Sequence, residues 1–154
     1  MPTLTARPTN ALARSYDIAA GGAPAGTLAT AWMKTTASLT LGGRAFDLVR
    51  TSTFGPYQLD GAMGIIATAI QRSVFRQRYD IEFGRRRWTL QPASMWGRRF
   101  VLLDEGGQEI GEVTPDTWWS TRCRVTVPDD VPTEVAVFVL WLVVVSWRRS
   151  AAAA

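Results

Sequence analysis

The sequence contains no histidine and a single cysteine, Cys123. Without histidine, Ser-His and Cys-His nucleophile arrangements are excluded and the commonest zinc ligand is missing. One cysteine excludes an intramolecular disulfide and a cysteine-cluster metal site, and it favours a reducing compartment. Arg122 and Arg124 would lower the pKa of an exposed thiol at Cys123, whereas an alternating strand would bury it. We expect no metal, no cofactor and a packed, inactive thiol.

Long hydrophobic runs are also scarce, and the one at Val135–Trp147 is too short for an ordinary membrane span, which needs about 20 residues. A tilted anchor and, from the many valines, a strand are the alternatives. Acidic residues and Pro132 before the run, with Arg148 and Arg149 after it, favour a helix. A helix that is apolar on every face must be enclosed on every face. We therefore predict a buried helix over about 132–148.

Lysine is nearly absent: all but one of the 17 basic residues are arginines, and the net charge is +4. Arginine favours planar contacts with phosphate and carboxylate, although a GC-rich genome would produce the same excess. The N-terminus "MPTLTARPTNALARSYD" lacks the apolar segment of a secretory signal, so export by that route is not expected. The glycines of "GAMGII" lack the lysine of a phosphate loop, and we expect no enzymatic activity.

Short apolar runs alternate with glycine-bearing turns between Tyr16 and Val127, as in all-β domains. Eleven strands are predicted: "YDIAA", "GTLATAWM", "ASLTL", "RAFDLVR", "PYQLD", "MGIIATAI", "RYDIEF", "RRWTLQ", "FVLLDE", "QEIGEV" and "CRVTV". Serial hairpins close into a barrel that leaves no free edge. We predict a mainly β fold, a closed antiparallel barrel of about eleven to twelve strands around the C-terminal helix.

The predicted organisation is one domain at 16–149. Residues 1–15 are expected to be disordered or loosely attached, and residues 150–154 to form a frayed tail.

The hairpin "YDIAAGGAPAGTLATA", the segment "YQLDGAMGIIATAI" followed by "RYDIEF", the hairpin "LLDEGGQEIGEV" and the final "EVAVFVLWLVVVSW" resemble the tubby-like fold. Within that fold the chain resembles LURP-one-related proteins and phospholipid scramblases. The resemblance covers about residues 16–149 and rests on order and spacing. It implies a barrel of about twelve strands around a central C-terminal helix, and a general habit of binding anionic lipid.

The sequence departs from scramblases in three features. It has neither their proline-rich N-terminal region nor their cysteine cluster, and "VPDDVPTE" stands where they carry an acidic calcium-binding segment. Asp129, Asp130 and Glu134 do not match a glycine-turned calcium loop. The resemblance therefore does not imply calcium-triggered lipid scrambling here.

Arginines are densest between Arg72 and Arg99, where only Asp80 and Glu82 oppose them. Arg85, Arg86 and Arg87 follow Gly84 at a predicted hairpin tip, and Arg98 and Arg99 follow Gly97. We predict that these five arginines project towards a common anionic ligand, the alternative being solvated loops. Four tryptophans near this region or at turns, Trp88, Trp96, Trp118 and Trp119, suit a membrane interface or base stacking, or else cover an open end of the barrel.

These observations predict a cytoplasmic, non-catalytic binding module, peripheral at the inner face of the membrane. Its expected partner is an anionic phospholipid surface or an acidic protein, bound through the arginine-rich loops. A nucleic-acid-binding protein that uses the same arginines and a protein-interaction scaffold are the alternatives. The sequence does not indicate an oligomeric state.

Overall fold

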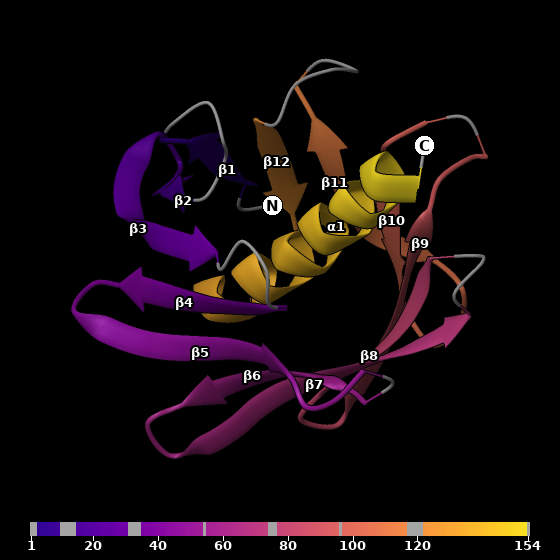
Figure 1. Ribbon diagram of the computed structural model, residues 1–154, viewed down its shortest axis with the longest axis horizontal. Coiled ribbons are helices and arrows are strands. Elements are labelled where there is room, and N and C mark those ends of the chain that lie inside the picture. The colour runs from indigo at the N-terminus through magenta and orange to yellow at the C-terminus, as the bar shows by residue number, and fades with distance from the viewer. Residues whose placement is uncertain are drawn as a thin grey trace.

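Twelve strands and one helix make up the described part of the computed structural model, which covers residues 3–9, 15–30, 35–53, 55–73, 77–95, 97–116 and 122–153 (Figure 1). The strands are β1 (Thr3–Pro8), β2 (Ser15–Ala20), β3 (Ala23–Thr30), β4 (Thr36–Leu41), β5 (Arg44–Arg50), β6 (Tyr57–Gly61), β7 (Gly64–Ser73), β8 (Arg78–Phe83), β9 (Arg86–Pro92), β10 (Phe100–Leu103), β11 (Glu109–Pro115) and β12 (Cys123–Thr126). The helix α1 spans Thr133–Ala153.

Each strand pairs antiparallel with its neighbours in the chain, and β1 pairs with β12 to close the barrel. The predicted closed antiparallel barrel is therefore confirmed. Alternation of side chains along the strands explains its lining, because every second residue points inward. In β4, for example, Ala37, Leu39 and Leu41 are buried whereas Ser38 and Thr40 are exposed.

The segment 1–15 was predicted to be loosely attached, and this is wrong for residues 3–8. They form β1, in which Leu4 and Ala6 point into the barrel and are buried. β1 pairs with β2 on one side and with β12 on the other. The physical reason is closure: an antiparallel meander needs an even number of strands for its first and last strands to pair antiparallel. The eleven predicted strands correspond to β2–β12.

The helix α1 lies inside the barrel, which Figure 1 shows curving around it. Every residue from Val135 to Val145 is at most 9% exposed, on all faces of the helix. The predicted buried helix is thus confirmed, and it ends later than predicted. The segment 150–154 was expected to fray, but α1 continues to Ala153, as the high helix propensity of alanine favours.

Polar contacts hold both ends of α1 to the barrel wall. Near its start, Glu134 forms an ion pair with Arg44 of β5 at 3.7 Å. Near its end, Arg148 Nη2 donates to Thr30 Oγ1 of β3 at 3.1 Å. Ser146, the one hydroxyl in the apolar run, is buried against the Tyr79 hydroxyl at 2.8 Å. These contacts show which rim each end of the helix reaches.

The barrel therefore has two distinguishable ends, because successive turns of an antiparallel meander alternate between them. The proximal rim, where α1 begins, carries the turns β2–β3, β4–β5, β6–β7, β8–β9 and β10–β11. The distal rim, where α1 ends, carries the connections β1–β2, β3–β4, β5–β6, β7–β8, β9–β10 and β11–β12.

Among the described residues, no helix has the length and apolarity needed to pass through a membrane.

Candidate functional site

Arg85, Arg86 and Arg87 lie at the proximal rim, in the hairpin between β8 and β9. Phe83 pairs with Arg86, so Gly84 and Arg85 form a two-residue turn. Gly84 has φ +59°, which two-residue hairpin turns require and which glycine adopts without strain. The sequence therefore predicted this tip correctly, and the turn leaves Arg85 exposed.

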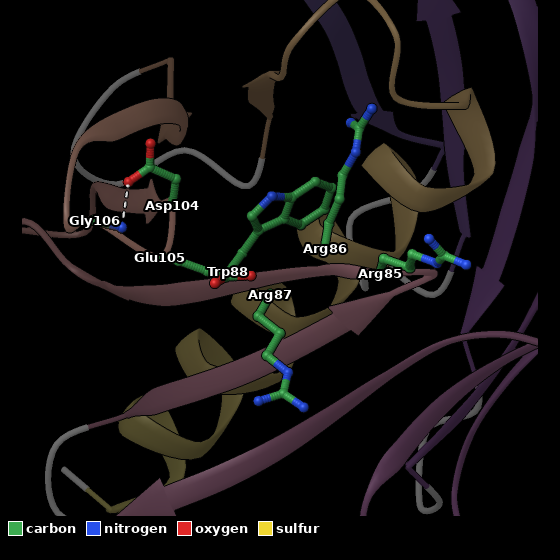
Figure 2. Close-up of a pocket in the computed structure, with 7 residues that line it drawn as sticks. All are labelled: Arg85, Arg86, Arg87, Trp88, Asp104, Glu105 and Gly106. Atoms are coloured by element: carbon green, nitrogen blue, oxygen red, sulfur yellow. Dashed lines mark hydrogen bonds between the residues drawn. The ribbon is translucent and has the colours of Figure 1, made fainter.

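A shallow pocket of about 350 Å³ opens beside this hairpin (Figure 2). It is lined by Arg85, Arg86, Arg87, Trp88, Asp104, Glu105 and Gly106. Figure 2 shows the Arg86 and Arg87 side chains leaving the strand in opposite directions, as neighbouring residues of a strand do. Asp104 Oδ1 accepts the backbone N–H groups of Gly106 and Gln108, both at 2.9 Å, and so orders the acidic turn. The pocket is mixed in charge.

Acidic partners further offset the arginines of the hairpin. Arg86 Nη2 donates to Asp130, in the segment before α1, and forms an ion pair with it. This hydrogen bond raises the pKa of Arg86 and lowers that of Asp130. Arg87 forms a cross-strand ion pair with Glu82 at 3.6 Å. Of the three predicted arginines, only Arg85 is exposed without an ion pair among the described residues.

The two predicted arginine groups do not meet, because Arg98 and Arg99 follow the opposite end of β9. Arg86 is the first residue of β9, which ends at Pro92, and the β9–β10 loop with Arg98 lies at the distal rim. The expectation that both groups face a common ligand is therefore wrong. Adjacent turns of a meander lie at opposite ends of a barrel, and only one strand separates these two turns.

Arg99 is engaged by two carboxylates on β11. Its Nη2 and Nε lie 2.5 Å from Glu109 Oε1 and Glu112 Oε2, respectively. The hydrogen bond to Glu112 is the main cause of its raised pKa. Arg99 is thus a wall contact and not a free ligand-binding cation.

Arg98 packs against the end of α1. Its guanidinium lies 4.3 Å from the centre of the Trp147 ring, and its carbonyl accepts the indole N–H at 3.0 Å. Partial burial lowers the pKa of Arg98. The β9–β10 loop is thereby fixed to the helix end.

Charge is segregated between the two rims, which sequence reasoning missed. Described arginines at the distal rim or in the strand halves next to it are Arg7, Arg50, Arg72, Arg78, Arg98, Arg99, Arg122, Arg124, Arg148 and Arg149, and the carboxylates there are Asp17, Asp80 and Asp116. Asp47 and Glu112 lie at the middle of their strands. Around the proximal rim lie Asp60, Glu82, Asp104, Glu105, Glu109, Asp129, Asp130 and Glu134, with Arg44, Arg85, Arg86 and Arg87. The distal rim is the basic end of the protein. The alternation of turns along the meander could have revealed this.

The tryptophans considered from the sequence are only partly described. Trp88 points into the barrel, is 5% exposed and belongs to the core. It is therefore not an interfacial side chain. Trp96, Trp118 and Trp119, like Arg76, lie outside the described residues.

Cys123 is buried in β12, and desolvation raises the pKa of its thiol to about 12. The flanking arginines therefore do not activate it, and the predicted packed thiol is present. We expect a maleimide or disulfide reagent at pH 8 to modify the native protein at least a hundredfold more slowly than the urea-unfolded protein, because thiolate is the reactive form. Timed mass spectrometry of both states measures this. Equal rates in the two states would contradict the buried thiol.

In the described part of the chain, no group of three or more histidine, cysteine, aspartate or glutamate side chains is placed to hold a metal ion. Comparison of the chain with family models, curated proteins and solved structures gives no match.

Proposed function

We propose that the protein is a non-catalytic module that docks its distal rim on an anionic phospholipid surface, at the cytoplasmic face of a membrane. The observation that carries this proposal is the segregation of arginine to that rim. Each basic residue close to an anionic bilayer contributes on the order of 1 kcal/mol. Several arginines on one rim act together, whereas the carboxylates of the proximal rim would be repelled. The charge distribution thus gives the docked barrel a preferred orientation.

The apolar side chains at the distal rim favour a bilayer over a nucleic acid. Met95, in the β9–β10 loop beside Arg98, is 91% exposed, and Ile70, on the outer wall next to Arg72, is 47% exposed. Aliphatic side chains among arginines suit a headgroup region, in which bases contact phosphate and apolar groups reach the acyl boundary. Single-stranded nucleic acid is instead bound on exposed aromatic rings. Of the described tryptophans, Trp88 and Trp141 are buried, and the half-buried Trp147 ring is in contact with Arg98.

A relation to the tubby-like fold, and within it to LURP-one-related and scramblase-like proteins, is part of this proposal. The closed barrel around a hydrophobic C-terminal helix supports it. A shared fold alone does not establish function, so the proposed lipid binding rests on the charges of the distal rim.

Flotation with vesicles tests the proposal and compares the two rims directly. Arg72 and Arg78 are 64% and 46% exposed at the distal rim, where both form ion pairs with the same carboxylate, that of Asp80, so together they retain a net positive charge. We expect R72S/R78S to lose about 2 kcal/mol of binding to phosphatidylglycerol vesicles, roughly thirtyfold. R85S/R87S, with the same change in charge at the proximal rim, should bind as the wild type does. Neutral phosphatidylcholine vesicles should bind none of the three proteins.

Three results would contradict this proposal. Loss of binding only in R85S/R87S would place the site at the β8–β9 hairpin, as the sequence predicted. If the wild type does not float with vesicles but shifts the mobility of arbitrary DNA or RNA, a nucleic-acid-binding protein is favoured. If it binds neither vesicles nor nucleic acid, the protein-interaction scaffold is favoured. A thermal melt of each variant verifies that it is folded, since exposed charges contribute little to stability.

A further inference from the structure

Two arginines from distant parts of the chain converge on one aromatic ring at the distal rim. Arg50, the last residue of β5, places its guanidinium carbon 4.8 Å from the centre of the Tyr57 ring. Arg149, near the end of α1, places its guanidinium carbon 6.0 Å from the same centre. Tyr57 itself is fully buried and packs against Trp141. The ring fixes both cations at the place where the helix leaves the barrel.

No aspartate or glutamate neutralises this pair. All aspartates and glutamates belong to the described residues, and none forms an ion pair with Arg50 or Arg149. Two like charges in a half-buried setting repel each other. Several other arginines have carboxylate partners, and Arg99 has two. The pair is therefore an electrostatic cost that an anion would remove.

Both guanidinium groups also retain unused donors. Arg50 uses Nε in a 3.3 Å hydrogen bond to the Gly55 carbonyl, and Arg149 uses Nη1 in a 2.9 Å hydrogen bond to Gln71 Oε1. A guanidinium has five N–H donors in a planar fork. These two neutral contacts orient the side chains without neutralising their charge. The arrangement is preorganised for an oxyanion.

The Tyr57 ring that both arginines contact carries a further polar group. Among the described residues, the Tyr57 hydroxyl is the one buried side-chain polar atom without a hydrogen-bond partner. Its neighbour Tyr79 is satisfied by Ser146, and burial raises the pKa of Tyr79 to about 12. Buried polar atoms without partners are uncommon and often mark a functional site. This observation is independent of the charges.

We propose that Arg50 and Arg149, both in contact with the Tyr57 ring, form a binding site for a phosphate monoester headgroup at the distal rim. A monoester carries close to two negative charges at pH 7 and three terminal oxygens, which match two guanidinium forks. A phosphate diester carries one charge and presents fewer oxygens. This inference rests on the proposed docking at anionic phospholipid and adds a preference within it, for monoester lipids over diester lipids of equal surface charge.

The test compares phosphatidic acid with phosphatidylglycerol vesicles whose measured zeta potentials are equal. We expect the wild type to bind the phosphatidic acid vesicles roughly tenfold more tightly, as hydrogen bonds between charged groups allow. R50Q and R149Q should each lose this preference while still binding both vesicles. R78Q is the matched control, because it removes one charge from the same rim away from Tyr57; it should weaken both bindings equally and keep the preference.

A second arm distinguishes lipid from soluble phosphate. Glycerol 3-phosphate, followed by calorimetry, should bind weakly to the wild type, and R149Q should abolish that heat. If the preference for phosphatidic acid survives in both R50Q and R149Q, or if the wild type shows no such preference, the proposed phosphate site is wrong, whereas the general docking to anionic vesicles still holds. Absence of binding to every anionic vesicle would instead reject the proposed function.

Discussion

Replacing Leu140 by aspartate should unfold most of the protein at 25 °C. Leu140 is fully buried in the middle of α1, and the residues around it on the helix are buried and apolar. An aspartate there would carry either an unpaired charge or a protonated carboxyl without partners. The expected cost exceeds about 4 kcal/mol, a large part of the roughly 5–15 kcal/mol that stabilises a typical domain. Urea titration followed by tryptophan fluorescence measures it.

The matched control for this change is Met63→Asp, which introduces the same side chain at a fully exposed position of the β6–β7 turn. It should shift the free energy of unfolding by no more than about 0.5 kcal/mol. A helix that does not pack against the barrel would make the two substitutions equally mild. Similar urea midpoints for L140D and the wild type would therefore refute the enclosed helix. Deletion of residues 134–154 should likewise give insoluble or unfolded protein, because it removes the centre of the core.

Replacing Gly26 by alanine should give the second large effect. Gly26 lies in β3, where an added Cβ would come within 1.9 Å of the Thr40 carbonyl oxygen and 2.8 Å of Leu41 Cδ2. The first of these atoms is backbone, so β3 and β4 would have to separate locally. We expect a loss of about 3 kcal/mol, the upper range for overpacking, measured by thermal and urea unfolding.

Gly106→Ala is the control for this substitution. At Gly106 the nearest atom to an added Cβ is Asp104 Oδ1 at 3.4 Å, which is an ordinary contact. Its unfolding free energy should change by no more than about 0.5 kcal/mol. A G26A protein as stable as G106A would show that the two strands lie further apart than the structure places them.

The barrel fold could be predicted from the sequence because one physical argument identified its central element, the buried C-terminal helix. The run Val135–Trp147 is too short to span a membrane, and as a helix it is apolar on every face. It therefore had to be enclosed by the rest of the protein, and the consecutive β-hairpins could enclose it. β1 was missed because its apolar signal is reduced to Leu4 and Ala6, between prolines and threonines. The odd number of predicted strands was itself a sign that one was missing.

The candidate site was less accessible, for two physical reasons. Arg87 and Arg98 are close in the sequence and were counted as one cluster of charge, whereas strand β9 places them at opposite ends of the barrel. Which arginines are neutralised by carboxylates depends on tertiary contacts. Asp130 reaches Arg86, for example, because α1 begins at that rim. The convergence of Arg50 and Arg149 on Tyr57 follows from the helix direction, which the run of apolar residues did not specify.

The closing seam between β1 and β12 determines when this protein can finish folding. Its two strands lie near opposite ends of the sequence, and α1, which follows β12, supplies the interior on which every strand packs. Hairpins such as β4–β5 can form early from local contacts, but they cannot bury their apolar faces until α1 has been synthesised. Contacts between distant residues slow folding, because a long loop must close before they form. We therefore expect a slow final folding step, in which nascent chains that lack α1 expose unclosed sheet edges and depend on chaperones.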